Sequence, residues 1–303
     1  MRRLHAKGAG GDATLMDTKG MLYLCATPIG NLEDITLRAL RILREADLVA
    51  AEDTRRTRKL FSHYQIHTPL TSYHDHNRRS KGQYLIGQLL EGKNIALVTD
   101  AGLPGVSDPG EELAAMAVEE GIKVVPVPGP SASLTALVAS GLPAGRFCFE
   151  GFLPARGKAR TARLEDLRPE KRTMLFYEAP HRLESTLSDM LKVLGDRRVC
   201  VARELTKVYE EIWRGNLQDA VEKFGRNTPK GEITLVLEGA RAEEPGGAGG
   251  ISFSAEALVS MVQDFEIRGL TRKEAIKEAS IKAGLPKREV YDALLQQKKT
   301  GGG

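Results

Sequence analysis

Short apolar runs alternate with amphipathic stretches from Met21 to about residue 145, and this alternation limits the possible folds more than any other feature. Apolar runs of about four to eight residues are typical of strands, and the stretches between them have helical spacing. This order favours an α/β fold with a parallel, doubly wound sheet, which binds ligands at the carboxyl ends of its strands. We expect strands at 22–27, 47–52, 69–74, 94–100 and 123–128, and helices near 34–45, 54–64, 80–91, 111–120 and 132–140.

A second α/β unit begins near Arg146. Its runs at 198–206 and 209–215 are too close in sequence for a crossover helix, so they predict a hairpin. A hairpin adds antiparallel pairs, and the second sheet is therefore predicted to be mixed. Its strands are expected at 146–152, 172–179, 198–206, 209–215 and 232–240, and its helices at 158–168, 181–194 and 217–224.

The length of 303 residues favours two large domains, at about 150 residues per domain. The start of the chain shows no apolar period, so we expect it to be disordered. A glycine-rich stretch after the second α/β unit predicts a linker to an all-helical end. We place a disordered extension at 1–20, an N-terminal α/β domain at 21–145, a second α/β domain at 146–240, a linker at 241–253 and a C-terminal helical unit at 254–298.

Composition excludes several classes of protein. Apolar residues make up 41% of the chain and charged residues 28%, which excludes wholesale disorder. No apolar stretch reaches about 18 residues, so we expect no membrane span. The basic start lacks the apolar core of a signal peptide. Three widely spaced cysteines, Cys25, Cys148 and Cys200, fit a reducing cytoplasm and no structural zinc.

Three loops rich in glycine and proline follow strands of the first sheet, at 27–32, 99–110 and 126–133. Because the carboxyl ends of parallel strands meet at one edge of a sheet, these loops together predict a ligand cleft. Asp100 ends a strand and is expected to contact the ligand, whereas Asp108 is expected to cap the next helix.

Polar residues also follow the second and third strands. Asp53 suits either a helix cap paired with Arg55 or a carboxylate that faces the cleft. His74 and His76 share one strand face, as metal ligands can, but the spacing supplies no third ligand and we predict no metal. The string GAGGDA at 8–13 has the letters of a dinucleotide fingerprint, but it follows no strand and is excluded.

Charge is concentrated in one segment. The net charge of +4 is too small to indicate a nucleic-acid partner, yet residues 156–172 hold seven basic and three acidic residues. This segment suits either binding to phosphates or a solvated helix face. Residues 271–297 resemble a helix-turn-helix unit, for which a small packing bundle is the alternative. Its inward residues are expected to be Ala275, Ile276, Ala279, Val290, Leu294 and Leu295.

Nine motifs occur in order along residues 21–240, namely LYLCATPIGNLEDIT, AAEDTR, HDHN, VTDAGLPGVSDPG, PVPGPSA, FEGFLP, FYEAPHR, ARELTK and KGEITLVLEG. Together they resemble the tetrapyrrole-methylase (class III) superfamily of S-adenosylmethionine-dependent methyltransferases. Within it they are most similar to the bacterial 16S ribosomal RNA (cytidine-2′-O)-methyltransferases. The resemblance implies S-adenosylmethionine in a cleft between two α/β domains, a homodimer, and 16S ribosomal RNA or the small ribosomal subunit as partner.

The resemblance also implies which residues hold the cofactor. The superfamily often has Gly-Asp-Pro where this chain has Thr99, Asp100 and Ala101, so the aspartate is kept and its neighbours differ. The implied contacts are Pro28, Ile29, Asp100, Ala101, Gly102, Leu103, Ser131, Ala132, Tyr177, Leu205, Ile233 and Thr234.

The implied reaction moves a methyl group from a sulfonium to a ribose 2′-oxygen. In-line alignment of the reacting atoms lowers the barrier, and a base helps to remove the hydroxyl proton. The sequence leaves the base open among Asp53, His74, His76 and Lys207. Contacts to RNA are expected from Arg55, Arg156, Lys158, Arg160, Arg163 and Arg182.

Two functions other than RNA methylation fit part of this sequence. A tetrapyrrole (precorrin) C-methyltransferase keeps the fold and changes the substrate, but it needs neither the basic segment nor the helical end. A DNA-binding regulator uses the helix-turn-helix unit, but it leaves the cleft loops without a purpose.

Overall fold

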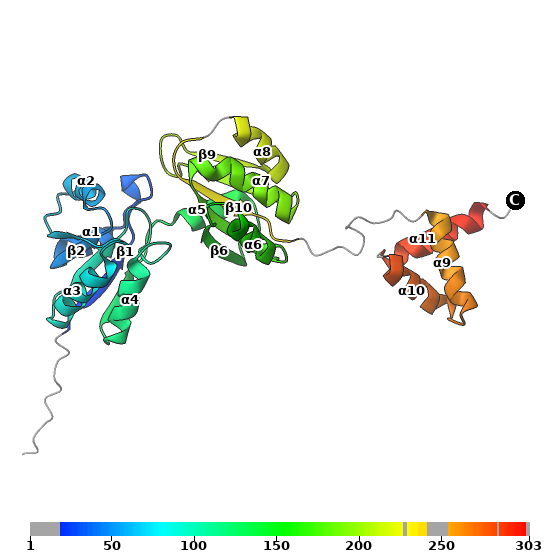
Figure 1. The fold of residues 1–303 in the computed structure, drawn as a ribbon, viewed down its shortest axis with the longest axis horizontal. Helices are drawn as coiled ribbons and strands as arrows, with labels where there is room; N and C mark the ends of the chain where they lie inside the picture. Colours follow the sequence, from blue (N-terminus) through cyan, green and yellow to red (C-terminus); the bar gives the residue numbers. More distant parts are fainter. Residues whose placement is uncertain (1–18, 227–228, 241–253, 284, 301–303) are drawn as a thin grey trace, which may run out of the picture. The chain divides into compact units, whose positions relative to one another are not determined.

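The computed structural model describes residues 19–226, 229–240, 254–283 and 285–300 (Figure 1). Nearly all of the expected extension at 1–20, and the expected linker at 241–253, lie outside the described residues. The chain divides into two compact units, with the division between Gly239 and Ala240. Each unit is described by itself.

The first sheet is parallel throughout and doubly wound, as the alternation of strands and helices predicted (Figure 1). Its strand order is β3-β2-β4-β1-β5. The central strand β4 and its neighbour β2 are wholly apolar, as expected of a parallel sheet that is covered on both sides, whereas the edge strands β3 and β5 contain polar residues. The five strands of the sheet have the following bounds. They are β1 (Met21–Cys25), β2 (Leu48–Ala51), β3 (Leu70–Ser72), β4 (Ile95–Val98) and β5 (Lys123–Val127).

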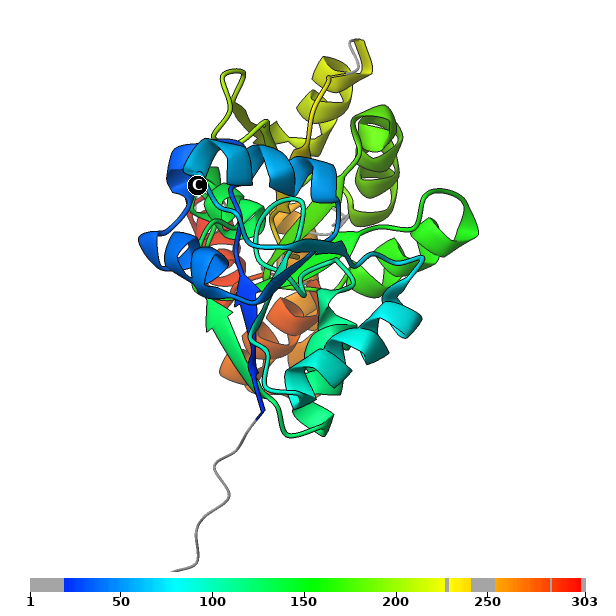
Figure 2. The same cartoon turned by 90° about the vertical axis from the view of Figure 1, so that its left-hand side faces the viewer.

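Helices cover both faces of the first sheet (Figures 1 and 2). Successive strand residues point to opposite faces, so Ala96 and Val98 of β4 join one core cluster while Ile95 and Leu97 join the other. One face carries α1 (Leu37–Glu45) and α2 (Thr54–Tyr64), and the other carries α3 (Arg78–Leu90) and α4 (Gly110–Glu119). A 3₁₀ turn, η1 (Leu32–Asp34), precedes α1.

The expected helix at 34–45 begins later, at Leu37. Thr36 caps the helix, because its hydroxyl accepts a hydrogen bond from the Ala39 amide at 3.1 Å. This cap fixes the boundary between the turn and the helix.

The second sheet is mixed, as predicted. Its order is β6-β7-β10-β8-β9, with β6 and β7 parallel and the other pairs antiparallel. The predicted hairpin is formed by β8 and β9. The strands are β6 (Phe147–Phe152), β7 (Thr173–Glu178), β8 (Arg198–Arg203), β9 (Glu211–Asn216) and β10 (Ile233–Leu237).

One helix differs from its expected place. The helix α5 (Ala132–Ser140) was expected within the N-terminal domain, but its Ala136 and Leu137 pack with Leu175 and Val236 of the second sheet. β5 is the last strand of the first sheet and lies at its edge. The helix that follows it therefore does not lead back to this sheet and packs on the second sheet instead. The other face of that sheet carries α6 (Lys158–Leu167), α7 (Leu183–Leu194) and α8 (Leu217–Arg226), with a 3₁₀ turn, η2 (Pro180–Arg182), before α7.

The described part of the C-terminal unit consists of helices, as expected. Residues from all three helices form its core, including Val262, Ala279 and Val290. Leu295 was expected to face inward, but it is exposed, because the turn of the helix places Leu294 on the core side. Gly284, between the last two helices, lies outside the described residues. The helices are α9 (Ala255–Ile267), α10 (Arg272–Ala283) and α11 (Lys287–Thr300).

Candidate active site

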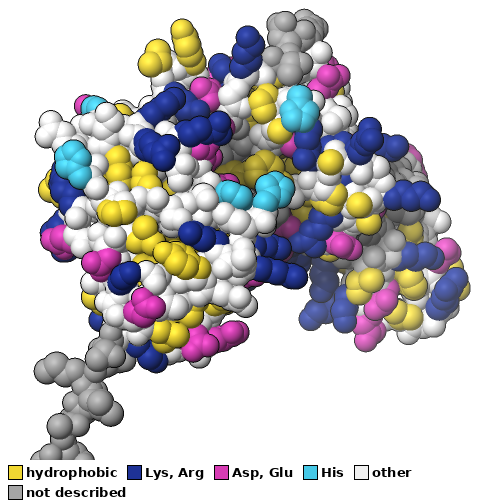
Figure 3. All heavy atoms as spheres, turned by 60° about the vertical axis from the view of Figure 1, so that its left-hand side comes forward, with side chains coloured by type: hydrophobic (Ala, Val, Ile, Leu, Met, Phe, Trp, Pro, Cys, Tyr) yellow, Lys and Arg dark blue, Asp and Glu magenta, His cyan; other side chains and the backbone are white. Residues whose placement is uncertain are grey.

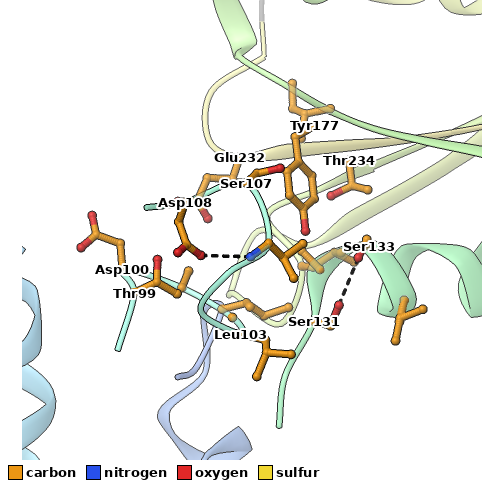
Figure 4. A pocket seen from close by; sticks show the side chains of 18 of the residues that line it. Thr99, Asp100, Leu103, Ser107, Asp108, Ser131, Ser133, Tyr177, Glu232 and Thr234 are labelled. Carbon is orange, nitrogen blue, oxygen red and sulfur yellow. Dashed lines mark hydrogen bonds between the residues drawn. The ribbon is translucent and has the colours of Figure 1, made fainter. Parts of the chain in front are cut away.

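A cavity of about 750 Å³ lies at the carboxyl ends of the first sheet's strands and against one face of the second sheet (Figure 4). This volume is in the range of small-molecule sites. The first sheet supplies the loops after β1, β2, β4 and β5. The second sheet supplies parts of β6, β7, β8 and β10.

Two of the predicted loops are joined by their backbones. The Thr27 amide donates to the Gly102 carbonyl at 2.9 Å, and the Gly102 amide donates back to Thr27 at 3.0 Å. Gly102 has a φ of +85°, which strains any residue with a Cβ atom. The loop after β1 is therefore held against the loop after β4. Ile29, in the loop after β1, lines the cavity.

Asp100 lies in the cavity wall at the end of β4. Its Oδ1 accepts a hydrogen bond from the Asp53 amide at 3.0 Å, and its Oδ2 lies 3.4 Å from the Arg56 guanidinium. Glu52 stands on the other side and accepts hydrogen bonds from the Thr99 hydroxyl and the Asp100 amide. Burial, helped by the negative charge of Glu52, raises the pKa of Asp100.

Asp108 holds its own loop together. Its carboxylate accepts hydrogen bonds from the amides of Gly105, Val106 and Gly110, the last at 2.7 Å. Figure 4 draws one of these hydrogen bonds. Burial raises the pKa of Asp108 although these amides favour its charged form. The carboxylate thus fixes the loop between β4 and α4 and leaves few lone pairs for a ligand.

The start of α5 also faces the cavity. Ser131 stands at the N-cap position, but its side chain makes no capping hydrogen bond and lies 3.1 Å from the Ser133 hydroxyl instead (Figure 4). Both serines and Ala132 line the cavity. The helix therefore presents hydroxyls and its positive end to a ligand.

Aromatic residues form the second sheet's part of the wall. The rings of Phe149 and Phe152 lie 5.0 and 5.7 Å from the ring of Tyr177, centre to centre. Sequence reasoning selected the tyrosine and missed the two phenylalanines. It also missed Glu52 and Arg56, which line the wall beside Asp100.

All the residues that the resemblance implied as cofactor contacts line the cavity, except Pro28. The wall includes Ile29, Asp100, Ala101, Gly102, Leu103, Ser131, Ala132, Tyr177, Leu205, Ile233 and Thr234.

None of the four suggested bases lies in the described cavity wall. Asp53 instead caps α2, and hydrogen bonds from the Arg55 side chain and amide hold its pKa well below the usual range, so it is a poor proton acceptor. Lys207 pairs with Glu204 at 2.7 Å and Glu232 at 3.1 Å, which raises its pKa and keeps it charged.

His74 and His76, the other two suggested bases, follow β3. Their rings meet edge to face with centres 5.9 Å apart. Among the residues that the structure describes, no group of three or more His, Cys, Asp or Glu side chains is placed to hold a metal ion.

Arg160 was expected to bind RNA, and this expectation is wrong. Its side chain is only 3% exposed, donates to the Thr186 hydroxyl at 2.7 Å and pairs with Asp189 at 2.8 Å. Helical spacing turns it toward α7, so it cannot reach a phosphate outside. The same spacing leaves Lys158 exposed.

The other expected RNA contacts are at or near the surface. Arg156 is exposed, and Arg163 is half-exposed beside Glu150. Arg55 is exposed and paired with Asp53, whereas Arg182 is mostly buried and donates to the Leu153 carbonyl at 2.7 Å. On the face shown in Figure 3, Lys and Arg side chains form separate groups.

Comparisons with known proteins agree on one family. The family described as Tetrapyrrole (Corrin/Porphyrin) Methylases matches residues 21–221. The Ribosomal RNA small subunit methyltransferase I of Halalkalibacterium halodurans is 51% identical to this chain, over 93% of the chain and 96% of that protein. The proteins of the same name from Bacillus subtilis (49%; 90% and 94%) and Escherichia coli O157:H7 (44%; 93% and 96%) are also similar.

Solved structures show the same fold. A diphthine synthase has a TM-score of 0.58 at 16% identity, covering 72% of this chain and 90% of that chain. A uroporphyrin-III-C-methyltransferase from Thermus thermophilus has a TM-score of 0.53 at 21% identity, covering 72% and 94%. Because the family model matches residues 21–221 and relatives are near 50% identical to it, this chain belongs to the tetrapyrrole (corrin/porphyrin) methylase family.

Proposed function

We propose that this protein uses S-adenosylmethionine to methylate the 2′-oxygen of a cytidine ribose in 16S ribosomal RNA. The observation that carries the proposal is the single cavity in which the implied cofactor residues come together, at the strand ends where α/β sheets bind ligands. The choice of RNA is supported by relatives near 50% identity that are named for the small ribosomal subunit.

The wall of the cavity fits the chemistry of S-adenosylmethionine. Carboxylates of Glu52, Asp100 and Glu232 suit a ligand with a sulfonium and an ammonium group. Tyr177 offers a flat face to an adenine, and the Thr234 and Ser131 hydroxyls offer hydrogen bonds. When bound, the cofactor supplies a methyl group that a nucleophile can attack.

The chain's own residues then act mainly by alignment. The bridged loops at Thr27 and Gly102, and the loop held by Asp108, are fixed before a ligand arrives. Rigid positioning of two reactants contributes up to about 7–11 kcal/mol to catalysis. Buried side chains such as Ile233 and Leu205 keep water from that part of the site.

The substrate is proposed to approach with its phosphates near Arg55, Arg156, Lys158 and Arg163. These side chains are exposed or half-exposed, unlike Arg160. A homodimer and a cytoplasmic location belong to this proposal. The described residues contain no helix long and apolar enough to cross a membrane.

Tetrapyrrole methylation remains the second candidate, because structures of that activity share the fold at 21% identity or less. Similarity at this level supports the fold alone. A DNA-binding regulator has less support, since it gives no use to the cavity.

The test supplies labelled S-adenosylmethionine together with small ribosomal subunits, free 16S RNA or uroporphyrinogen. We expect label in RNA, at the 2′-oxygen of a cytidine. The same position should be unmethylated in ribosomal RNA from a strain without this protein. Label in the tetrapyrrole alone, or unchanged methylation in that strain, contradicts the proposal.

A further inference from the structure

A bulge interrupts β6, the edge strand beside β7. Phe149 pairs with Leu175, but the register then shifts so that Gly151 pairs with Phe176 and Phe152 with Tyr177. In a regular strand, residues 149 and 152 point to opposite faces. The extra residue places both phenylalanines on the face of Tyr177, which is the cavity face.

The bulge depends on a glycine and on the cavity loop. Gly151 has a φ of +61°, and a Cβ atom there would lie 3.0 Å from the Ser107 hydroxyl. The strand thus touches the loop that Asp108 holds. Phe152 is directed to the place where that loop and the second sheet meet.

Phe152 lies at the exposed edge of the cavity. It is 55% exposed, whereas Ile233 and Thr234 of the same wall are buried. Val106 and Leu134 are the other large apolar side chains of the wall that are exposed. The exposed face of the Phe152 ring is therefore free to contact a ligand that enters the cavity.

Cationic side chains bind or follow the chain segment around Phe152. Arg182 donates to the carbonyls of Leu153 and Pro154, directly after Phe152. Arg163 pairs with Glu150, the extra residue of the bulge. The exposed Arg156 and Lys158 follow in the same segment of chain.

We propose that Phe152 stacks against the nucleobase of the nucleotide that is methylated, after that base has left its RNA stack. The inference rests on the proposed function and adds a substrate-binding residue to it. Proteins recognise single-stranded RNA by combining aromatic faces for splayed bases with cations for phosphates. The exposed ring at the cavity edge, followed in the chain by the exposed Arg156 and Lys158, offers both kinds of group.

The test compares Phe152→Ala and Phe152→Tyr with Phe147→Ala. Phe147 is a matched control, because it lies on the same strand, is 38% exposed and does not line the cavity. Three quantities are measured: the Kd for S-adenosylmethionine by calorimetry, the Kd for small ribosomal subunits from a strain without this protein, and kcat and KM for methyl transfer.

We expect Phe152→Ala to raise the Kd and KM for the subunits about 5- to 150-fold, the range for loss of one base–aromatic stack. Phe152→Tyr should restore binding, and Phe147→Ala should match the unaltered protein. The Kd for S-adenosylmethionine should stay unchanged in all three variants.

Unchanged subunit binding in Phe152→Ala overturns the stacking role. So does a matching loss in Phe147→Ala, or weaker binding of S-adenosylmethionine, which would assign the ring to the cofactor. If the unaltered protein transfers no methyl group to RNA, the proposed function fails and this inference fails with it. The unaltered protein therefore distinguishes the two failures.

Discussion

Replacing Asp100 tests the candidate site most directly. Asp100→Asn keeps the size of the side chain and an oxygen that can accept the Asp53 amide, but it removes the charge. Asp100→Ala also removes the acceptor and leaves that amide without its partner. The asparagine variant therefore isolates the role of the charge.

The size of the effect follows from the surroundings of the carboxylate. Its ion pair with Arg56 is long, at 3.4 Å, so part of the carboxylate remains available to a ligand. A hydrogen bond to a charged group contributes about 1.5–3 kcal/mol. Losing one such bond should raise the Kd for S-adenosylmethionine about 10- to 150-fold.

Stability should change in the opposite direction. Because burial and Glu52 raise the pKa of Asp100 above the ordinary value of 3.8, the ionised form destabilises the folded protein. Asp100→Asn should therefore be as stable as the unaltered protein, or more so, at neutral pH. This difference should shrink as the pH falls through the raised pKa and disappear below 3.8.

Calorimetry and thermal unfolding measure the two effects separately. Asp47→Asn is the control, because the Asp47 carboxylate also accepts a backbone amide, that of Asn94, but lies at the other end of the strands. An unchanged Kd for S-adenosylmethionine in Asp100→Asn, with the fold intact, refutes the assigned role. An equal loss in Asp47→Asn would show that the effect is not specific to the cavity.

Three further predictions concern the second α/β domain. Arg160→Met should lower the free energy of unfolding by about 1–3 kcal/mol in urea titrations, because it removes the donor to the buried Thr186 hydroxyl and the ion pair of Asp189. It should leave the salt dependence of RNA binding unchanged, and a lower salt dependence would return Arg160 to the RNA interface. Arg156→Glu combined with Lys158→Glu should weaken RNA binding and reduce the steepness of log K against log salt concentration by about 0.7 per lost contact. Equal slopes for this variant and the unaltered protein would exclude residues 156–158 from the RNA interface. Gly151→Ala should cost about 1–2 kcal/mol of stability in the same titrations, and no loss would show that the bulge does not need glycine.

The sequence predicted the sheets well because their strands have a strong physical signature. β4 and β10 are buried on both faces, so β4 is an unbroken apolar run and β10 is apolar except for Thr234. The loops that follow such strands must meet at one edge of a parallel sheet. This is why motifs far apart in sequence could be assigned to one cavity.

The packing of α5 and the burial of Arg160 differ from expectation for one shared reason, which is that sequence does not show what a helix packs against. The sequence shows that α5 is a helix but not which sheet it packs on, because its moderately apolar face fits either. Likewise, the arginines and lysines of 156–172 differ only in their position around α6. Arg160 is buried because it faces Ser185 and Thr186 of α7, a contact between segments 26 residues apart.

The bulge at Gly151 shows what sequence can and cannot indicate at a site. A glycine inside an apolar strand is a known sign of a bulge or a close backbone approach, so FEGF contained a usable signal. The direction of Phe152, however, follows from the shift between β6 and β7, which is a property of two paired strands and not of either one. One extra residue decides whether this ring faces the cavity or the opposite side of the sheet. Binding residues that depend on register therefore become visible only when the pairing is known.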